Sequence, residues 1–460
     1  NGAGAQAVEV VHRPDASFPP FRGTLDPLLA MTELLLKQVK VMDPGGPHHD
    51  AILDIRVRDG VVTELGERLM KGAAREVSRE GLHLSPGWVD LRAHFREPGE
   101  EWKQGILNGL DAAARGGFTA VAVLPSTTPT IDGRAGIDHL LHRSHGHAVK
   151  LLPLGGLTKG LKGEQLAELH DQRLAGAVGF TDDLHAIRNT RLMLLALQYS
   201  QGLPGEAPPI MVQPSDPYLT AGSQMHEGAM STRLGLKGAP ALAEQVLLQR
   251  DIALLAYAGG HLHVVTVSTA EGVALVRDAK ARGLKVTASV AAHHLLLDDG
   301  CLRGFETCYK VWPPLRDPGH IEALREGVKD GTIDAIVSDH RPEDREHKVL
   351  EYGQAAFGII GLETSFAVAN TALKGRMSLR RTIERYAHGP RQVLGLPKVH
   401  VTEGMSADLS LFDPEENWTC EATDLVSRSH NTPFLGQRFT GRALGIVARG
   451  QVVLHPVLSR

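Results

Sequence analysis

Eight short apolar runs recur along the middle of the chain, and most of them are separated by stretches with a helical pattern. The clearest helical stretches cover residues 102–115, 242–258 and 269–282. Buried strands that alternate with helices are typical of parallel sheets, and eight such repeats predict an α/β fold with a closed (β/α)8 barrel of the TIM type. An open doubly wound sheet is the alternative, but no G-x-G-x-x-G turn follows a strand. The eight apolar runs are residues 88–95, 120–125, 149–154, 177–181, 210–213, 262–267, 285–290 and 335–338.

Both ends of the chain show a different pattern, in which short alternating segments are separated by turns rich in glycine. Such alternation indicates antiparallel strands. Residues 31–84 and 400–460 are therefore predicted to form one small β-sandwich domain built from both ends, and residues 85–399 to form the barrel. The first 30 residues show neither pattern, and we expect them to be a flexible extension.

Composition narrows the classes of partner. Lysine and arginine total 49 against 53 aspartate and glutamate, so the net charge of -4 does not indicate a nucleic-acid partner. No run of 18 apolar residues is present, which argues against a membrane span. The three cysteines form no C-x-x-C pair, and we expect a reducing, cytoplasmic location.

Polar side chains follow most of the predicted barrel strands. Barrel active sites lie at the C-terminal ends of the strands, so these residues are expected to converge on one face. Strand ends also meet solvent and are often polar for that reason alone, which is the simpler interpretation. The first strand contributes Arg92, His94 and Arg96, and the last contributes Asp339.

Several longer motifs resemble those of class I dihydroorotases, of the amidohydrolase superfamily. The resemblance runs from about residue 31 to the end of the chain, and it implies a metal-dependent hydrolase barrel with a β-sandwich. It also implies a zinc centre and the reversible hydrolysis of dihydroorotate to N-carbamoyl-L-aspartate in pyrimidine biosynthesis. The motifs are residues 86–99, 225–238, 286–297, 309–316, 330–342 and 356–363.

The resemblance places metal ligands at six positions, but only three of them carry a residue that can bind metal well. His94, Asp182 and Asp339 form the residual set, and Asp339 is also the expected catalytic proton carrier. The other three positions, where the family has histidine, are Arg92, Gln213 and Thr266.

The substrate-binding positions implied by the resemblance are altered as well. Arg96, which is expected to hold the substrate carboxylate, is present. Ser126 and Trp312 stand where the family has asparagine, and Glu343 stands where it has histidine. We expect Trp312 to fill the pocket and Glu343 to repel an anionic substrate.

Arg92 suggests a rebuilt site, because a guanidinium cannot bind a metal but pairs well with carboxylates. We expect it to replace the metal cation and to pair with Asp182 and Asp339, while Asp183 is interpreted as a loop or capping residue. Zinc is then absent or present as at most one weakly bound ion.

Three functions remain open from the sequence. The first is a structural homologue with weak or no activity, which assembles with aspartate transcarbamoylase or with itself. The second is an active dihydroorotase or related cyclic amidohydrolase that uses one metal. The third is a module that binds a small carboxylate through Arg92 and Arg96.

Overall fold

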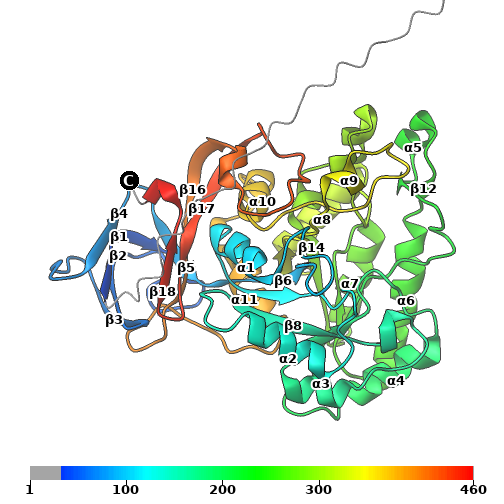
Figure 1. Cartoon of the computed structure of the whole chain (residues 1–460), viewed down its shortest axis with the longest axis horizontal. Helices are drawn as coiled ribbons and strands as arrows, with labels where there is room; N and C mark the ends of the chain where they lie inside the picture. The colour runs from blue at the N-terminus through cyan, green and yellow to red at the C-terminus, as the bar shows by residue number, and fades with distance from the viewer. Residues whose placement is uncertain (1–32, 459–460) are drawn as a thin grey trace, which may run out of the picture.

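Residues 33–458, the part of the chain that the computed structural model describes, form two sheets of eight strands and one small pair. Figure 1 shows the sheet that contains β1 to β5 (residues 33–86) and β16 to β18 (residues 408–454) at one end of the molecule, and the other sheet surrounded by helices. The extension predicted for residues 1–30 lies outside the described residues.

The second sheet is the predicted barrel. All its strands are parallel and follow one another in chain order, and a bridge between Ala93 and His340 joins the first strand to the last. Each of the eight apolar runs overlaps one strand, so the predicted (β/α)8 barrel is confirmed. The strands are β6 (Trp88–Ala93), β7 (Phe118–Val123), β8 (Lys150–Gly156), β9 (Gly179–Thr181), β10 (Ile210–Val212), β13 (Leu262–Val264), β14 (Val286–Ala291) and β15 (Ala335–Val337).

Helices cover the outer face of the barrel (Figure 1). The helix predicted over residues 102–115 begins only at Ile106, because Gly105 has a φ of 86° that a helix does not allow. The carboxylate of Glu97 then accepts the free Ile106 amide at 2.7 Å. The helices are α1 (Ile106–Arg115), α2 (Arg134–Arg143), α3 (Leu169–Ala175), α4 (Thr190–Ser200), α5 (Ala229–Leu234), α6 (Leu242–Ala258), α7 (Ala270–Ala281), α8 (Pro318–Asp330), α9 (Arg345–Lys348), α10 (Ser365–Leu373) and α11 (Leu379–Val393).

The other large sheet contains both ends of the described chain. Strand β5 pairs antiparallel with β16, which places Leu84 opposite Leu411, and we call this the composite sheet. One face packs a separate apolar core that includes Leu36, Leu84 and Leu411. The strands are β1 (Glu33–Val41), β2 (Ile52–Arg58), β3 (Val61–Gly66), β4 (Arg75–Ser78), β5 (His83–Pro86), β16 (Asp408–Thr419), β17 (Arg438–Ala448) and β18 (Gln451–Leu454).

An aromatic cluster joins the composite sheet to the barrel. Trp88 is fully buried at the start of β6, and its amide donates to Ser410 Oγ of β16 at 2.9 Å. Its ring lies 4.8–6.2 Å from four other aromatic rings, between centroids, which come from both parts of the molecule. The contact lies at the N-terminal end of β6. At the opposite end of the barrel, the loop between β16 and β17 makes a smaller contact, in which Asn431 Oδ1 accepts the Glu343 amide at 3.0 Å. The four rings are Phe118, Phe366, Tyr386 and Phe412.

A short excursion follows the fifth barrel strand. Strands β11 (Met225–His226) and β12 (Gly238–Ala239) pair in parallel on either side of α5. Arg316 fastens this excursion to the barrel, since its Nη1 donates to the carbonyl oxygen of Ala239 at 2.9 Å.

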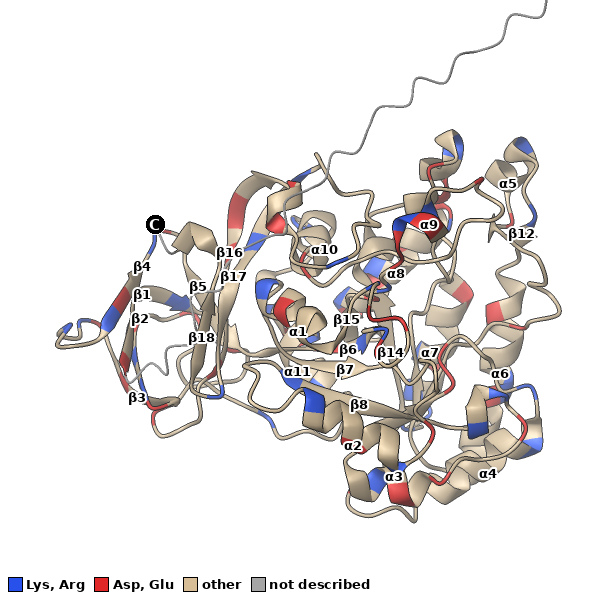
Figure 2. Cartoon of the chain, in the orientation of Figure 1, with Lys and Arg blue, Asp and Glu red and all other residues tan. Residues whose placement is uncertain are grey.

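Charge is spread over both parts of the molecule. Blue and red segments are interspersed along the ribbon in Figure 2. Within residues 33–458, no helix combines the length and the apolar character that a membrane crossing requires.

Candidate active site

Arg92 occupies the centre of the barrel mouth. Its Nε donates to Asp339 Oδ1 at 2.6 Å, and its Nη2 donates to Asp183 Oδ1 at 2.8 Å and to Gln213 Oε1 at 3.0 Å. The side chain is 1% exposed, and both carboxylates are buried. The guanidinium therefore links strands β6, β10 and β15 and the end of β9 through one set of ionic hydrogen bonds.

Strand geometry explains why Arg92 reaches this position. Side chains alternate along a strand, so Asp90 and Arg92 of β6 point to the same side, toward the barrel interior. Asp90 binds the last strand at this level, because its Oδ1 accepts the Ser338 amide at 2.8 Å and its Oδ2 accepts the Ser338 hydroxyl at 2.6 Å. This second contact holds β6 and β15 in register just below the Arg92 cluster.

His94 and Ser126 complete the cluster on the side of Asp183. The Nε2 atom of His94 lies 3.3 Å from Asp183 Oδ2, and the Ser126 hydroxyl donates to the same oxygen at 2.8 Å. Burial lowers the pKa of His94 to about 3, despite the neighbouring carboxylate, so the imidazole is neutral.

Asp182 lies elsewhere, and the predicted pair between Arg92 and Asp182 is wrong. The Oδ1 atom of Asp182 accepts the Thr158 amide at 2.8 Å, and its Oδ2 accepts the Thr158 hydroxyl. The central carboxylate is Asp183 instead. Asp183 is a loop residue, as predicted, because it lies in the turn after β9, but the prediction that it stays outside the site is wrong. The physical reason is the backbone of Asp183, whose φ of 55° turns its side chain inward directly after β9.

The pKa values of the two carboxylates in the cluster are shifted in opposite directions. Burial would raise the pKa of Asp183, but the neighbouring His94 and the Arg92 guanidinium hold it well below its usual range. For Asp339 burial outweighs Arg92, so its pKa is raised. Arg92 is thus paired most strongly with an ionised Asp183.

The residues of the barrel mouth do not fit a zinc centre. Zinc binds imidazole, thiolate and carboxylate, whereas three of the six positions are a guanidinium, an amide and a hydroxyl. The guanidinium lies between the carboxylates that would have to bind the ion, and a second cation there would be repelled. Among the described residues, the groups of three or more side chains spaced to hold a metal lie at two other places, and neither includes His94, Asp183 or Asp339.

Several buried polar atoms at the mouth have no hydrogen-bond partner among the residues that the structure describes, and three of them lie on residues that replace the expected histidines. Arg92 Nη1, Gln213 Nε2 and Thr266 Oγ1 are buried, yet none forms a hydrogen bond within the described part of the chain. Buried donors without partners are costly, so this corner is suited to a small oxygen-rich ligand or to water.

Arg96 is already paired on the substrate side. Its Nη2 contacts Glu343 Oε1, and its Nη1 lies 3.1 Å from Glu100 Oε2. Lys103 completes the group, with its Nζ 2.9 Å from Glu343 Oε2 and 2.6 Å from Glu100 Oε1. Glu343 therefore neutralises the arginine that was expected to hold a substrate carboxylate.

The remaining candidates lie around this centre. Trp312 packs edge-on against Phe357, with ring centroids 5.4 Å apart. His293 and His294 are buried directly after β14, and His294 Nε2 donates to the Pro313 carbonyl at 3.0 Å. That histidine is thus committed to a backbone contact.

The sequence did not reveal Lys103 or Asp90 as members of this region. Lys103 lies in the turn before α1, and nothing in its local pattern indicates a buried ion pair. Asp90 carried a usable signal, because it lies two residues before Arg92 on one face of a strand.

Known proteins provide a comparison for this geometry. A family model described as Dihydro-orotase-like matches residues 81–272. The chain is 40% identical to the dihydroorotase of Citrifermentans bemidjiense over 426 residues, which cover 91% of this chain and 99% of that protein. It is 41% identical to the dihydroorotase of Pelotomaculum thermopropionicum, with 93% of this chain and 100% of that protein covered.

Solved structures agree at the level of the fold. The L-hydantoinase (dihydropyrimidinase) from Arthrobacter aurescens superposes with a TM-score of 0.80 at 24% identity, covering 92% of this chain and 96% of that one. A dihydropyrimidinase from Brevibacillus agri gives a TM-score of 0.75 at 22% identity, covering 92% and 95%. At this identity the likeness shows a shared architecture alone.

Replacing Arg92 by an apolar residue of similar length should destabilise the protein strongly. Arg92→Met leaves Asp183 and Asp339 buried without their cation, which is expected to lower the free energy of unfolding by ~3–5 kcal/mol in urea titrations. The matched control is Arg277→Met, which removes an exposed pair with Asp330 and should cost less than ~1 kcal/mol. Equal effects of the two substitutions would contradict a central role for Arg92.

Asp90 should make stability depend on pH. Burial raises the pKa of Asp90 to about 7, although the Ser338 hydrogen bonds oppose the shift. In the unfolded chain this group ionises near pH ~4. Between about pH 4 and 7 the carboxyl group is therefore ionised in the unfolded state and protonated in the folded state, and a rise in pH stabilises the unfolded state relative to the folded one. Stability from this group is therefore complete below about pH 4 and is lost as the pH rises through 7.

Asp90→Asn tests this dependence, because an amide does not titrate. The free energy of unfolding of the wild type, minus that of the variant, should fall by roughly 3 kcal/mol between pH 4 and pH 7. Urea titrations at several pH values measure this difference, and other titrating groups cancel in it. A difference that is constant with pH would show that Asp90 is ionised in the folded protein.

Proposed function

Because the chain belongs to the dihydroorotase family, we propose that it is a homologue whose metal centre has been replaced by an ion-pair cluster. Its turnover is weak or absent, and it acts as a structural subunit in pyrimidine biosynthesis. The observation that supports this proposal best is the position of the Arg92 guanidinium, between Asp183 and Asp339.

The chemistry of amide hydrolysis explains why this position matters. A metal supplies such a reaction with hydroxide at neutral pH and polarises the carbonyl group. Arg92 occupies the place between the carboxylates, and Asp339, the expected proton carrier, accepts a 2.6 Å hydrogen bond from it. Burial raises the pKa of Asp339, but its Oδ1 is occupied by Arg92, so taking up a proton at that oxygen would break the ionic hydrogen bond.

The substrate side supports the same proposal. Glu343 and Glu100 both contact Arg96, so a substrate carboxylate would have to displace a buried carboxylate from the same guanidinium. That exchange gains little, since one ionic pair is traded for another. Selection for binding an anionic substrate would not be expected to keep Glu343 at this position.

Binding of a small carboxylate without turnover is the second candidate function. The unpartnered Arg92 Nη1, Gln213 Nε2 and Thr266 Oγ1 favour it, since together they could donate to an oxyanion. In this case N-carbamoyl-L-aspartate would bind saturably and be released unchanged.

The wild-type chain should show no turnover above background in either direction, with or without added zinc. Rates at least ~1,000-fold below those of an active dihydroorotase assayed in parallel are expected, because the groups that activate water are missing. Formation and hydrolysis of dihydroorotate can be followed by chromatography.

Two variants make this test decisive. If the wild type is inactive, Asp339→Asn should give the same background rate of dihydroorotate conversion as the wild type. If the wild type has a true residual activity, this substitution should lower the rate. The double variant Arg92→His/Thr266→His restores two imidazoles and should gain zinc-dependent turnover over the wild type. Zinc-dependent turnover by the wild type, lost in Asp339→Asn, would overturn the proposal in favour of a one-metal enzyme.

The proposed partner is aspartate transcarbamoylase. The family resemblance supports this choice, as does a scaffold that is intact around an altered mouth. Helix α6 adds a surface: it is apolar around most of its circumference, and Leu242 and Val246, four residues apart, are 51% and 41% exposed. The neighbouring α4 exposes Leu195 and Tyr199 at the same spacing.

We also propose a cytoplasmic location, which agrees with three cysteines that form no disulfide.

Leu242→Glu/Val246→Glu should abolish assembly with purified aspartate transcarbamoylase. The partner would bury the two introduced carboxylates on the apolar face of α6, and burying unpaired charges is costly. The two proteins should therefore no longer co-elute in size-exclusion chromatography with light scattering. The control is Met70→Glu, which changes an apolar side chain that is 85% exposed on the composite sheet. Failure of the wild type to co-elute would contradict this partner, and a homodimer sensitive to the same variant would assign the face to self-association.

A further inference from the structure

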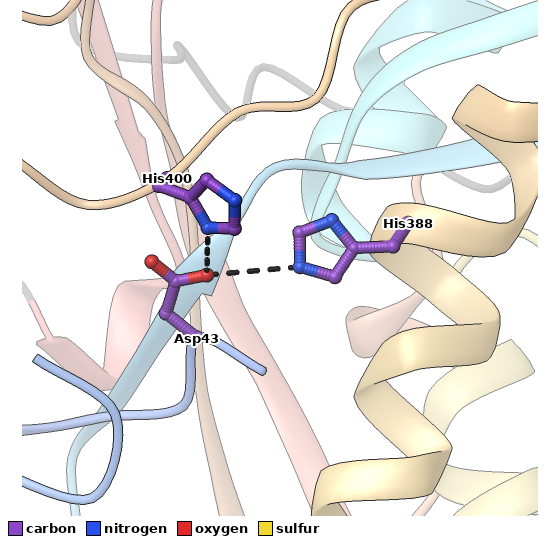
Figure 3. Close-up of side chains that lie close together, drawn as sticks. All are labelled: Asp43, His388 and His400. Atoms are coloured by element: carbon purple, nitrogen blue, oxygen red, sulfur yellow. Dashed lines mark hydrogen bonds and ion pairs between the residues drawn. The ribbon is translucent and has the colours of Figure 1, made fainter. Parts of the chain in front are cut away.

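Three side chains with metal-binding atoms meet where the composite sheet adjoins the barrel. Asp43 follows β1, His388 belongs to α11, and His400 lies between α11 and β16. Figure 3 shows both imidazoles directed at one oxygen of Asp43. The His400 Nδ1 atom lies 2.9 Å from Asp43 Oδ1, and His388 Nε2 lies 3.6 Å from the same oxygen.

The carboxylate of Asp43 is held in place by its surroundings. It is fully buried, and its Oδ2 accepts the Val401 amide at 2.8 Å, which leaves Oδ1 directed at the imidazoles. The turn after Asp43 depends on Gly46, whose amide donates to the Asp43 carbonyl at 2.9 Å. A Cβ atom at Gly46 would lie 1.9 Å from Asp43 Oδ2, so any other residue would displace the carboxylate.

His388 is incompletely satisfied in this arrangement. Both of its ring nitrogens are shielded from solvent, and neither has a hydrogen-bond partner among residues 33–458. Its Nε2 faces Asp43 at a distance too long for a hydrogen bond. A buried imidazole without partners is costly, so its position calls for an additional ligand.

A second group of similar composition shows the contrast. His226, Asp317 and His320 also lie close together, but their nitrogens are in use. His226 Nδ1 accepts from Arg316 Nη1 at 3.1 Å, and His320 Nδ1 accepts the Ala270 amide at 3.0 Å. Ordinary hydrogen bonds therefore account for that group.

We propose that Asp43, His388 and His400 bind a divalent transition-metal ion, with Zn²⁺ preferred, and that this ion clamps the composite sheet to the barrel. Two imidazoles and one carboxylate are a donor set suited to zinc, and unsuited to calcium or magnesium, which prefer oxygen ligands. The three ligand atoms already lie within 4.8 Å of one another. In a tetrahedral zinc site they would be ~3.3 Å apart, so the imidazole side chains need to move only slightly.

The charge state of Asp43 agrees with this role. Burial acts to raise the pKa of Asp43, but the His388 imidazole and the Val401 amide, followed by His400, more than offset it and hold the pKa below its ordinary value. The carboxylate is therefore ionised at neutral pH, as a metal ligand must be.

The position of the site favours a structural ion over a catalytic one. Asp43 follows a strand of the composite sheet, and His388 lies in the last barrel helix, so the ion would join residues that are more than three hundred positions apart in the chain. A cross-link that closes so long a loop removes much conformational entropy from the unfolded chain and is therefore expected to stabilise the fold. His400 is 33% exposed, which leaves a coordination position open to water.

Zinc titration of the full-length chain, stripped with a chelator and dialysed, tests the site. Calorimetry should show one Zn²⁺ site, and saturation at about 100 times the dissociation constant should raise the melting temperature by ~2–3 °C. His388→Gln and His400→Gln should each weaken binding more than ~100-fold and abolish the shift in melting temperature. Cobalt substitution of the wild type should give the absorption of a four-coordinate ion.

Matched variants separate this site from the barrel mouth and from general effects. His320→Gln, in the hydrogen-bonded group, and His94→Gln, at the mouth, should both keep full zinc binding. Circular dichroism of the metal-free variants checks that each is folded, and the metal-dependent change is compared only among folded proteins. The proposal would be overturned if the wild type did not bind zinc, or if His388→Gln bound one zinc ion as tightly as the wild type. Loss of zinc binding in His94→Gln would assign the ion to the barrel mouth instead.

Discussion

A permanent positive charge buried at the centre of the barrel constrains everything around it. Arg92 cannot lose its proton, so folding must supply it with negative charge and with acceptors for its donors. Asp183, Asp339 and Gln213 supply the charge and the acceptors for Nε and Nη2 from three other points on the barrel rim, while Nη1 has no partner among the described residues. A single cation thereby decides which carboxylates face inward and what chemistry they can still perform.

The main junction between the two parts of the molecule lies away from the barrel mouth. The composite sheet and the aromatic cluster around Trp88 lie at the N-terminal end of β6, whereas the Arg92 cluster lies at the other end. The loop between β16 and β17 makes a second contact at the mouth, where the Asn431 side chain binds the Glu343 amide and the Arg341 carbonyl. Because the aromatic cluster is separate from the mouth, it is compatible with a chain that is 40% identical to a dihydroorotase while three of the six positions expected to bind metal carry other residues.

The sequence predicted the barrel well, because the periodicity of buried strands is a local property that the composition of each run expresses directly. It predicted the site less well. Whether Asp182 or Asp183 faces the centre depends on a positive φ directly after β9, which no hydrophobic pattern records. The pairing of Arg96 with Glu343 and Lys103 joins segments far apart in the chain, and the approach of His388 and His400 to Asp43 does the same. Such contacts follow from tertiary packing and are therefore not encoded in local spacing.

The pairing of β5 with β16 sets the order in which the protein can be completed during synthesis. Strands β1 to β5 leave the ribosome first and β5 can pair with β1, but its second partner, β16, lies at residues 409–412 and emerges only after the barrel strands. Until then β5 presents an unpaired strand edge while the whole barrel is being made, and such edges are templates for association with other chains. A chain interrupted before β16 would contain every strand of the barrel and still carry this open edge. The segment from β16 onward thus completes the sheet that β1 to β5 begin.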